Sequence, residues 1–241
     1  MKKPDSITKN DWLLLQKKYR NLESVIKKLE KNYPVQYLIG HVEFYGLKLF
    51  VNESVLIPRF ETEYLVEKTL EYINKLNLEE KSVLDIGTGS GCIGIALKNQ
   101  IPSLSITAID ISRKALRIAK RNAKYHKTKI NFINKSLFKY NLINKYDILI
   151  SNPPYIKKGT AVDQKIKYEP AKAIYGGIEF YEQIFKIAKK GLNKQYLIAL
   201  EIEETTGSEL KKLAKKHFPK DKIKLEKDLA KKDRYLFIYS E

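Results

Sequence analysis

Cysteine and histidine, two common metal ligands, are scarce in this chain of 241 residues. The lone Cys92 excludes an internal disulfide and a cysteine zinc cluster, which fits a reducing compartment. The three histidines (His41, His126 and His217) are scattered without ligand spacing, so we expect no metal site. No apolar run approaches the length of a membrane span, and the first residues lack an apolar signal region. These absences predict a cytoplasmic protein with no membrane contact.

Acidic residues are also few, because 28 of them stand against 46 lysines and arginines, giving a formal net charge of +18. Such a charge would attract nucleic acid or a ribosome-associated partner. However, only six of the cations are arginines, the side chain that phosphate sites favour, and lysines occur along every segment. A lysine-rich composition therefore explains the charge better, and nucleic acid stays a possible but not a favoured partner.

Apolar sequence is ample for one sizeable α/β domain with a small appendage, since 43% of the residues are hydrophobic. From residue 82 onward, strand patterns alternate with helical ones. The predicted strands are 82–85, 105–110, 129–134, 146–151, 195–201 and 234–239, and the main helices are 92–99, 112–126, 178–190 and 206–217. This alternation predicts an α/β fold with a doubly wound, mostly parallel, Rossmann-like sheet. A further strand near 222–229 would allow an antiparallel edge.

The N-terminal residues show helical spacing instead. Apolar side chains recur at this spacing over 5–29, which predicts one helix or two helices with a break near Asn21. Asn10 or Asp11 could cap its start, and Pro34 ends it. Such a helix must pack on another part of the chain to be stable.

A hairpin pattern follows this helical part. Alternating residues over 37–51, with a turn candidate at 43–46, predict a β-hairpin. Another helix starts at Glu61 or Thr62 and runs to about residue 76. We therefore expect three parts, which are a short helical segment (1–33), the hairpin with its connector (34–60) and the main domain (61–241).

A glycine-rich loop follows the first predicted strand of the main domain, which ends at Asp85. Gly87, Gly89 and Gly91 lack a Cβ, so the backbone here can turn tightly and approach a ligand closely. A literal G-x-G-x-x-G also occurs, with Gly94 as its third glycine, and this motif is typical of dinucleotide sites. The loop therefore predicts a nucleotide-type ligand at the start of the following helix.

Asp110 ends the next predicted strand, roughly 20 residues after the glycines, the spacing at which a carboxylate binds ribose hydroxyls. Both NAD and S-adenosylmethionine carry such a ribose. The carboxylate of Asp85 beside the loop would oppose a pyrophosphate but suits a ligand that bears an ammonium and a sulfonium. Asn152, at a later strand end, offers no hydride chemistry but suits the positioning of an amine or amide. Both features favour the methyl donor over NAD.

Asn152, Pro153, Pro154 and Tyr155 follow the apolar strand pattern 146–151. Ligands of open α/β sheets bind at this carboxyl edge. The prolines fix φ and supply no N–H, so the backbone carbonyls beside them are rigid and free to accept hydrogen bonds. An amide oxygen and such a carbonyl can take the two hydrogens of a flat –NH2 group while the aromatic ring stacks on its plane. The alternative is a proline-stiffened turn that closes a buried strand.

In this order, the motifs resemble those of the protein-glutamine N5-methyltransferases that modify class I peptide chain release factors. The resemblance covers roughly residue 34 to the end. Its most specific segments are Pro34-Val-Gln-Tyr-Leu-Ile-Gly40 and Val55-Leu-Ile-Pro-Arg-x-Glu-Thr-Glu63. The other matching segments are Phe44-x-Gly46, 85–96, 152–156, Glu169-Pro170, Gly176-Gly177 and 228–234. The glycine loop is common to most such methyltransferases, and the Asn-Pro-Pro-Tyr motif is shared with adenine-N6 enzymes.

The resemblance implies a class I methyltransferase fold with S-adenosylmethionine as cofactor. The donor-binding residues would be Gly87, Thr88, Gly89, Ser90 and Gly91 at the methionine end, Asp110 at the ribose, Leu137 near the adenine, and Asn152. Asn152 and the carbonyl of Pro153 would hold the substrate glutamine amide, with Pro154 beside them and Tyr155 packing on it. Asn152, Pro153 and Tyr155 are thus the expected catalytic residues, while Arg59, Glu61 and Thr62 would close over the donor side.

The chain departs from the family pattern at several places. Only about 33 residues precede Pro34, where the family generally carries several helices that dock the release factor. Phe60 stands in place of a usual proline, and Ser136 in place of an acid for the adenine amine. Glu203 and Thr206 replace an expected glycine and glutamine. The residues expected to carry the methyl transfer are unchanged. The departures instead affect the assignment of the protein substrate.

The implied activity is methylation of the glutamine in the Gly-Gly-Gln loop of class I release factors. The nearest alternative is a glutamine of a ribosomal large-subunit protein. An adenine-N6 nucleic-acid methyltransferase would use the same Asn-Pro-Pro-Tyr motif but would need a region that recognises a flipped base. A donor-binding module without activity is a fourth possibility, against which the intact motif argues.

Overall fold

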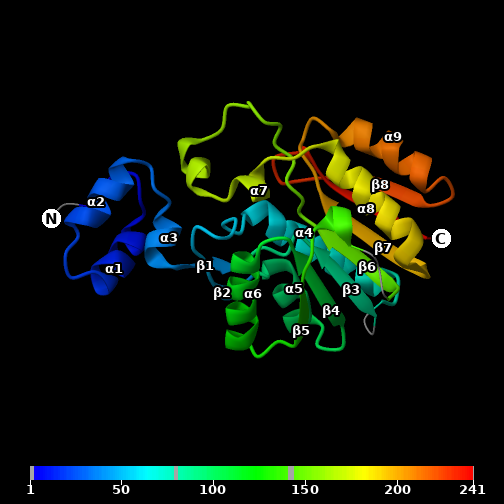
Figure 1. The fold of residues 1–241 in the computed structure, drawn as a ribbon, viewed down its shortest axis with the longest axis horizontal. Coiled ribbons are helices and arrows are strands. Elements are labelled where there is room, and N and C mark those ends of the chain that lie inside the picture. Colours follow the sequence, from blue (N-terminus) through cyan, green and yellow to red (C-terminus); the bar gives the residue numbers. More distant parts are fainter. Residues whose placement is uncertain (1–2, 79–80, 141–143, 241) are drawn as a thin grey trace.

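The computed structural model describes residues 3–78, 81–140 and 144–240. Within them lies a seven-stranded sheet with the strand order β5-β4-β3-β6-β7-β9-β8 (Figure 1). Its strands are β3 (Ser82–Ile86), β4 (Ser105–Asp110), β5 (Ile130–Asn134), β6 (Tyr146–Ser151), β7 (Leu192–Glu201), β8 (Lys222–Lys227) and β9 (Asp233–Tyr239). β9 runs antiparallel to both β7 and β8, whereas the other pairs are parallel. The predicted doubly wound, mostly parallel sheet with an antiparallel edge is confirmed.

Helices cover both faces of this sheet. One apolar core joins it to α4 (Phe60–Lys75), α5 (Cys92–Gln100) and α6 (Arg113–Tyr125). A second core joins the opposite face to η1 (Leu137–Lys139), α8 (Ile178–Gly191) and α9 (Gly207–His217). Successive side chains of a strand point to opposite faces, so Ile148 and Ile150 of β6 lie in the first core and Leu149 in the second. Every residue of β6 is buried, as expected for a central strand covered on both faces.

The direction of the chain through the sheet reverses beside β3. After β3 the chain proceeds outward to β4 and β5, and it then returns to β6 on the other side of β3. Such a reversal leaves a crevice at the carboxyl ends of the strands. The glycine loop follows β3 and Asn152 follows β6, so the fold brings the two principal sequence motifs to one crevice.

The N-terminal segment forms two helices, α1 (Lys9–Lys18) and α2 (Glu23–Glu30), with a break around Asn21. The hydroxyl oxygen of Thr8 accepts a hydrogen bond from the N–H of Asp11 at 3.0 Å and caps α1. The prediction of Asn10 or Asp11 as the N-cap is therefore wrong, because both lie inside the first turn. The two helices share a small apolar core, which includes Trp12 and Leu15 and also Leu38 and Ile39 of the segment that follows.

A short helix and a hairpin connect this segment to the main domain. The prediction of a hairpin over 37–51 is wrong at its start, because residues 37–39 belong to α3 (Val35–Ile39). β1 (His41–Phe44) and β2 (Leu47–Phe50) then pair antiparallel around Tyr45 and Gly46. Both turn residues have positive φ (50° and 72°), the geometry that matches the twist of a two-residue hairpin.

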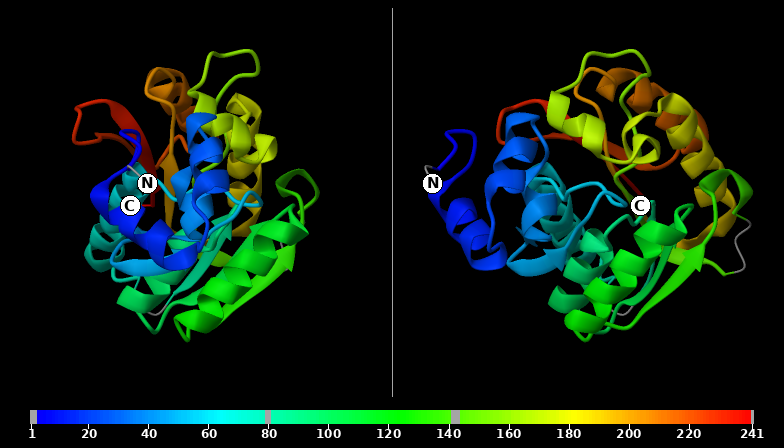
Figure 2. Two further views of the ribbon diagram at one scale, coloured as in Figure 1. Left: turned by 90° about the vertical axis from the view of Figure 1, so that its left-hand side faces the viewer. Right: turned by 60° about the vertical axis from the view of Figure 1, so that its left-hand side comes forward.

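A long connection after β6 carries η2 (Gln164–Tyr168) and α7 (Ala171–Ile174). Figures 1 and 2 show it rising beside the N-terminal helices and above the carboxyl edge of the sheet. The hydroxyl of Tyr168 donates to the carbonyl of Lys31 at 2.8 Å, and Asn32 donates to Gln164 at 3.0 Å. The N-terminal segment thus contacts the connection that follows the Asn-Pro-Pro-Tyr motif. None of the helices in the described residues is long and apolar enough to cross a membrane.

Candidate active site

A cavity of about 410 Å³ opens at the carboxyl ends of β3, β4 and β6. Its walls come from 54–56, the glycine loop, 109–112, 135–138, 151–154 and 170–173. The volume falls in the range of small-molecule sites. Segments that are distant in sequence therefore enclose one ligand-sized space at the topological switch of the sheet.

The glycine loop contributes its backbone to one wall. Gly87 and Gly89 line the cavity with positive φ values of 72° and 56°, and a Cβ at Gly87 would meet no atom within 4 Å. Gly91, with φ of 83°, packs instead against α5 and α6. Thr88 and Ser90 are buried. Of the five predicted loop residues, only Gly87 and Gly89 face the cavity, while Thr88, Ser90 and Gly91 shape the loop from behind.

Asp110, at the end of β4, lines the same cavity. One carboxylate oxygen accepts the N–H of Gly89 at 2.9 Å and the other accepts the N–H of Ser112 at 2.7 Å. Burial raises the pKa of Asp110 above its ordinary value, although these two bonds oppose the shift. The carboxylate is thus held by two backbone groups and keeps lone pairs that can accept hydroxyl hydrogens.

Apolar side chains form the far wall. Leu137 lines the cavity together with Ile111 and Phe138, which are 52% and 50% exposed although both are large hydrophobic residues. Ser136, in the place of the expected acid, caps η1 by accepting the N–H of Phe138 at 3.3 Å. This wall suits the flat face of a base, and Ser136 offers it a hydroxyl in place of a charge.

Asp85 does not reach the cavity, so the expectation that it lies beside the ligand is wrong. Its side chain is fully buried under the loop and accepts a hydrogen bond from Thr88 Oγ1 at 2.6 Å. Burial raises the pKa of Asp85 to about 7. A carboxylate immediately before a turn can fold under it, and sequence spacing alone does not separate the two positions.

Asn152, Pro153 and Pro154 line the cavity from the end of β6. The Nδ2 of Asn152 donates to Thr62 Oγ1 at 3.0 Å, and no hydrogen bond to its Oδ1 is found among the described residues. Thr62 lies on α4 and is buried, with 2% of its surface exposed. The amide nitrogen of Asn152 is therefore bound to Thr62, and its amide oxygen is left free to accept a hydrogen bond.

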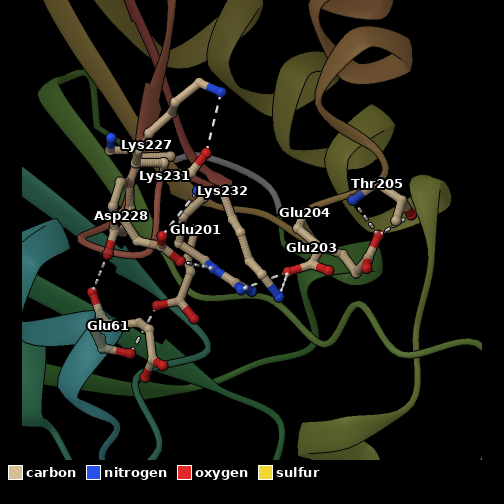
Figure 3. A network of polar contacts seen from close by, with 12 residues as sticks. Glu61, Glu201, Glu203, Glu204, Thr205, Lys227, Asp228, Lys231 and Lys232 are labelled. Carbon is tan, nitrogen blue, oxygen red and sulfur yellow. Dashed lines mark hydrogen bonds and ion pairs between the residues drawn. The ribbon is translucent and has the colours of Figure 1, made fainter.

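Tyr155 lies on the other side of the motif. It lines a neighbouring cavity of about 470 Å³ near the start of α8, and the first cavity is not lined by it. Its hydroxyl donates to Glu201 Oε1 at 3.2 Å, and Thr62 Oγ1 donates to Glu201 Oε2 at 2.7 Å. Burial raises the pKa of Glu201 to about 7. Figure 3 shows Glu201 between Glu61 and the turn that carries Asp228 and Lys232.

Arg59 does not close over the donor side, and none of Arg59, Glu61 and Thr62 lines the cavity. Arg59 forms an ion pair with the buried Glu169 at 2.6 Å. Burial raises the pKa of Glu169, although Arg59 opposes the shift. Glu169 precedes 170–173, which line the cavity, so this pair ties one wall of the cavity to the start of α4.

The other departures from the family pattern lie around this core. Phe60 is 65% exposed at the start of α4. Thr206 donates its hydroxyl hydrogen to the carbonyl of Glu203 at 2.8 Å just before α9. These residues lie at or just before the starts of α4 and α9, and none of them lines the first cavity.

The cavity fits S-adenosylmethionine. Open space lies over the glycines, a carboxylate stands where a ribose would lie, and an apolar wall stands opposite for a base. Within the residues that the structure describes, no group of three His, Cys, Asp or Glu side chains could hold a metal ion. The fold and this cavity define a class I S-adenosylmethionine-dependent methyltransferase.

Comparisons with known proteins narrow this class to a family. A family model described as methyltransferase small domain matches residues 62–173. The release factor glutamine methyltransferase of Flavobacterium psychrophilum is 36% identical over 98% of this chain and 86% of its own length. The enzyme of the same name from Streptococcus pneumoniae is 40% identical over 90% of this chain and 78% of its length. The chain belongs to the release factor glutamine methyltransferase family.

Solved structures agree on the fold. A ribosomal protein L11 methylase from Lactobacillus delbrueckii aligns with a TM-score of 0.59 at 18% sequence identity. The alignment covers 79% of this chain and 84% of that protein. At this identity the likeness supports the methyltransferase fold and carries no information about the acceptor.

Proposed function

We propose that the protein transfers a methyl group from S-adenosylmethionine to the side-chain amide nitrogen of the glutamine in the Gly-Gly-Gln loop of class I peptide chain release factors. The observation that carries the proposal is the arrangement of Asn152. Its nitrogen donates to Thr62, which leaves its oxygen free to accept, and both Asn152 and Pro153 line the cavity. Two acceptors match the two hydrogens of a primary carboxamide.

The chemical difficulty is the nucleophile, because the lone pair of a carboxamide nitrogen is delocalised into its carbonyl. S-Adenosylmethionine, when bound, supplies an electrophilic methyl group on a sulfonium centre. Asn152 and Pro153 accept both amide hydrogens, which orients the nitrogen and increases its electron density. Fixing the orientation of the reacting group is itself worth up to ~7–11 kcal/mol in favourable cases. The motif holds no strong base, so the proton leaves to water after methyl transfer.

The donor side would be held by other residues. Asp110 accepts the ribose hydroxyls, the backbone of Gly87 and Gly89 lies along the methionine end, and Leu137 packs near the adenine. Asn152 would border both ligands, because it lines the same cavity as the donor-binding residues and is also the first residue of the motif that holds the substrate amide. This division of roles separates donor binding from acceptor positioning.

The release factor would dock beside the cavity on the N-terminal segment. The turn between α2 and α3 contacts the connection after β6, because Lys31 accepts from Tyr168 and Asn32 donates to Gln164, so a protein bound there would also lie near Asn152. The division into parts 1–33, 34–60 and 61–241 is kept as part of this proposal. The small core around Trp12 is separate from the two cores of the sheet and supports a distinct N-terminal unit, but it includes Leu38 and Ile39 and so crosses the boundary at 33/34.

A methyl-transfer assay with three acceptors tests the proposal. The full chain is incubated with S-adenosylmethionine and a release factor, a ribosomal large-subunit protein or an adenine-containing duplex, and mass spectrometry then locates the methyl group. We expect the methyl on the glutamine of the Gly-Gly-Gln loop. Methylation of only another acceptor would overturn the assigned substrate and keep the chemistry, and no transfer to any of them would favour a binding module.

A further inference from the structure

Three hydrogen bonds, one buried and two partly buried, connect one carboxylate to two side chains of the Asn-Pro-Pro-Tyr motif. Glu201, the last residue of β7, accepts from Thr62 Oγ1 at 2.7 Å and from the hydroxyl of Tyr155 at 3.2 Å. Thr62 in turn accepts from Asn152 Nδ2 at 3.0 Å. Glu201 and Thr62 are only 1% and 2% exposed, so water does not substitute for these partners.

When Glu201 is ionised and can only accept, the number of hydrogens fixes the direction of each bond. A threonine hydroxyl has one hydrogen, and the Thr62 hydrogen goes to Glu201. Towards Asn152, the hydroxyl can therefore only accept, and the amide nitrogen must face it. A flipped amide would place two oxygens 3.0 Å apart with no hydrogen between them. The Glu201 carboxylate thus decides which end of the Asn152 amide faces the cavity.

The same carboxylate also restrains the aromatic ring of the motif. Its other oxygen accepts the Tyr155 hydroxyl, and the backbone carbonyl of Glu201 accepts the hydroxyl of Tyr181 at 3.0 Å. The first bond anchors the Tyr155 ring at its far end, away from the backbone of the motif, and the second attaches Tyr181 to the end of β7. One residue of β7 therefore sets two side chains on a loop that follows β6.

We propose that Glu201 and Thr62 are positioning residues, which hold the Asn152 oxygen towards the substrate amide and fix the Tyr155 ring on the other side of the motif. The inference deepens the proposed function, because it concerns the acceptor side of the same cavity. Neither residue lines that cavity, so both act through Asn152 and Tyr155. Substituting either residue should therefore lower kcat and leave the dissociation constant for S-adenosylmethionine unchanged.

Substitution of Thr62 tests the first link. Thr62→Val keeps the shape and removes the hydroxyl, so we expect kcat to fall roughly 10–100-fold, the loss expected for one buried hydrogen bond of this kind. Thr62→Ser keeps the hydroxyl and should recover most of the rate. Thr69→Val is the matched control on the same helix, because Thr69 is equally buried but donates to the helix carbonyl of Leu65 at 2.6 Å. It should leave kcat within about twofold of the wild-type value.

Substitution of Glu201 tests the second link. Glu201→Gln removes the charge and replaces one acceptor by a donor, so the side chain no longer fixes the Thr62 hydrogen and the Asn152 amide is free to turn its nitrogen towards the cavity. We expect loss of kcat with the dissociation constant for S-adenosylmethionine within about twofold. The double variant Thr62→Val/Glu201→Gln should be no slower than the slower single variant, since both break one chain of bonds. Additive losses, or a Thr62→Ser variant as slow as Thr62→Val, would overturn the inference.

A measurement without substrate separates this inference from the proposed function. In protein labelled with ¹⁵N-asparagine, the side-chain NH2 signal of Asn152 is identified by its loss in Asn152→Ala. We expect slow hydrogen exchange at this group in wild type and in Thr69→Val, and faster exchange in Thr62→Val. Equal exchange in wild type and Thr62→Val would overturn the orientation argument, whichever acceptor the enzyme methylates.

Discussion

At the scale of single residues, the cavity divides donor and acceptor between two strand ends on either side of β3. Asp110 ends β4 and Asn152 follows β6, and both line the cavity. Asp110 is a carboxylate held by two backbone N–H groups, whereas Asn152 is an amide held by one hydroxyl. Their chemistry therefore predicts opposite effects of substitution on binding and on turnover.

Asp110→Asn tests this division. The variant keeps the shape but loses the charge and one acceptor, so the dissociation constant for S-adenosylmethionine should rise roughly 10–100-fold, equivalent to about 1.5–3 kcal/mol. Asn152→Ala should leave that constant within about twofold while turnover falls roughly 100-fold or more. Isothermal titration with the donor and a methyl-transfer assay measure the two quantities. Equal loss of both quantities in either variant would contradict the separation.

Glu201 predicts a dependence of stability on pH. Burial raises its pKa from 4.5 in the unfolded chain to about 7 in the folded protein, so the folded state binds its proton more tightly. Its stabilising contribution is complete below about pH 4.5 and is lost as the pH rises through 7. The groups that face it are Thr62 and Glu61 of α4, Arg234 and Tyr235 of β9, Tyr155 and Tyr181.

The comparison of wild type with Glu201→Gln isolates this contribution, because Asp85 and the facing groups are the same in both proteins. The free energy of unfolding of wild type relative to the variant should fall by up to ~3 kcal/mol between pH 4.5 and 8. Urea unfolding at several pH values measures it. A difference that stays constant or grows with pH would show that Glu201 does not titrate in this way.

At the scale of elements, the Asn-Pro-Pro-Tyr loop depends on close backbone contact with the residues before α8. A Cβ at Gly176 would lie 2.2 Å from the carbonyl oxygen of Pro154 and 2.9 Å from the ring of Phe180. No side chain fits there unless the motif moves. Steric exclusion therefore explains why a glycine occupies position 176, independently of the agreement of 176 and 177 with the family pattern.

Gly176→Ala should accordingly displace the motif. We expect turnover to fall at least about tenfold, because a shift of the loop misplaces the acceptors of the substrate amide. Gly46→Ala is the control, since Gly46 has φ of 72° but a Cβ there would meet no atom within 4 Å. It should cost about 1–2 kcal/mol of stability from backbone strain alone and leave turnover unchanged. Full activity of Gly176→Ala would refute the steric argument.

At the scale of the whole molecule, arginines and lysines are distributed differently, because the arginines are concentrated on one helix. Three of the six arginines lie on α6, at positions 113, 117 and 121, and they are exposed together with Lys114, Lys120 and Lys124. None of these six has an ion-pair partner among the described residues, although Arg113 donates to Asn134 and Arg121 stacks on Phe50. A lysine-rich composition does not account for this clustering of arginines.

We therefore expect polyanions to bind mainly at α6. The triple variant Lys114→Glu/Arg117→Glu/Lys120→Glu should reduce the slope of log affinity against log salt for single-stranded RNA by about 2. The control reverses Lys211, Lys212 and Lys215, which are exposed on α9, and changes the net charge equally. Fluorescence anisotropy at several salt concentrations gives both slopes. An equal effect of the two variants would mean that the charge acts diffusely, as composition alone suggests.

Most of the fold follows from sequence periodicity, because strands and helices of the main domain repeat at distinct spacings. The helix ends and strand ends lie within a few residues of their predicted positions. The errors lie where periodicity carries no signal. The cap of α1 is Thr8 because its hydroxyl is one residue before the first turn, and Asp85 turns under its loop because Thr88 offers it a partner.

The amino-acid sequence alone predicts the local chemistry, which is a glycine turn after one strand, a carboxylate after the next and an amide with two prolines after another. Local spacing encodes these features because each depends on a few consecutive residues. The contacts of Thr62 with Asn152, 90 residues away, and with Glu201, 139 residues away, arise only in the folded chain. These contacts between α4, β7 and the loop after β6 form because the whole sheet and its helices pack together. The residue spacing within a single segment therefore cannot predict them.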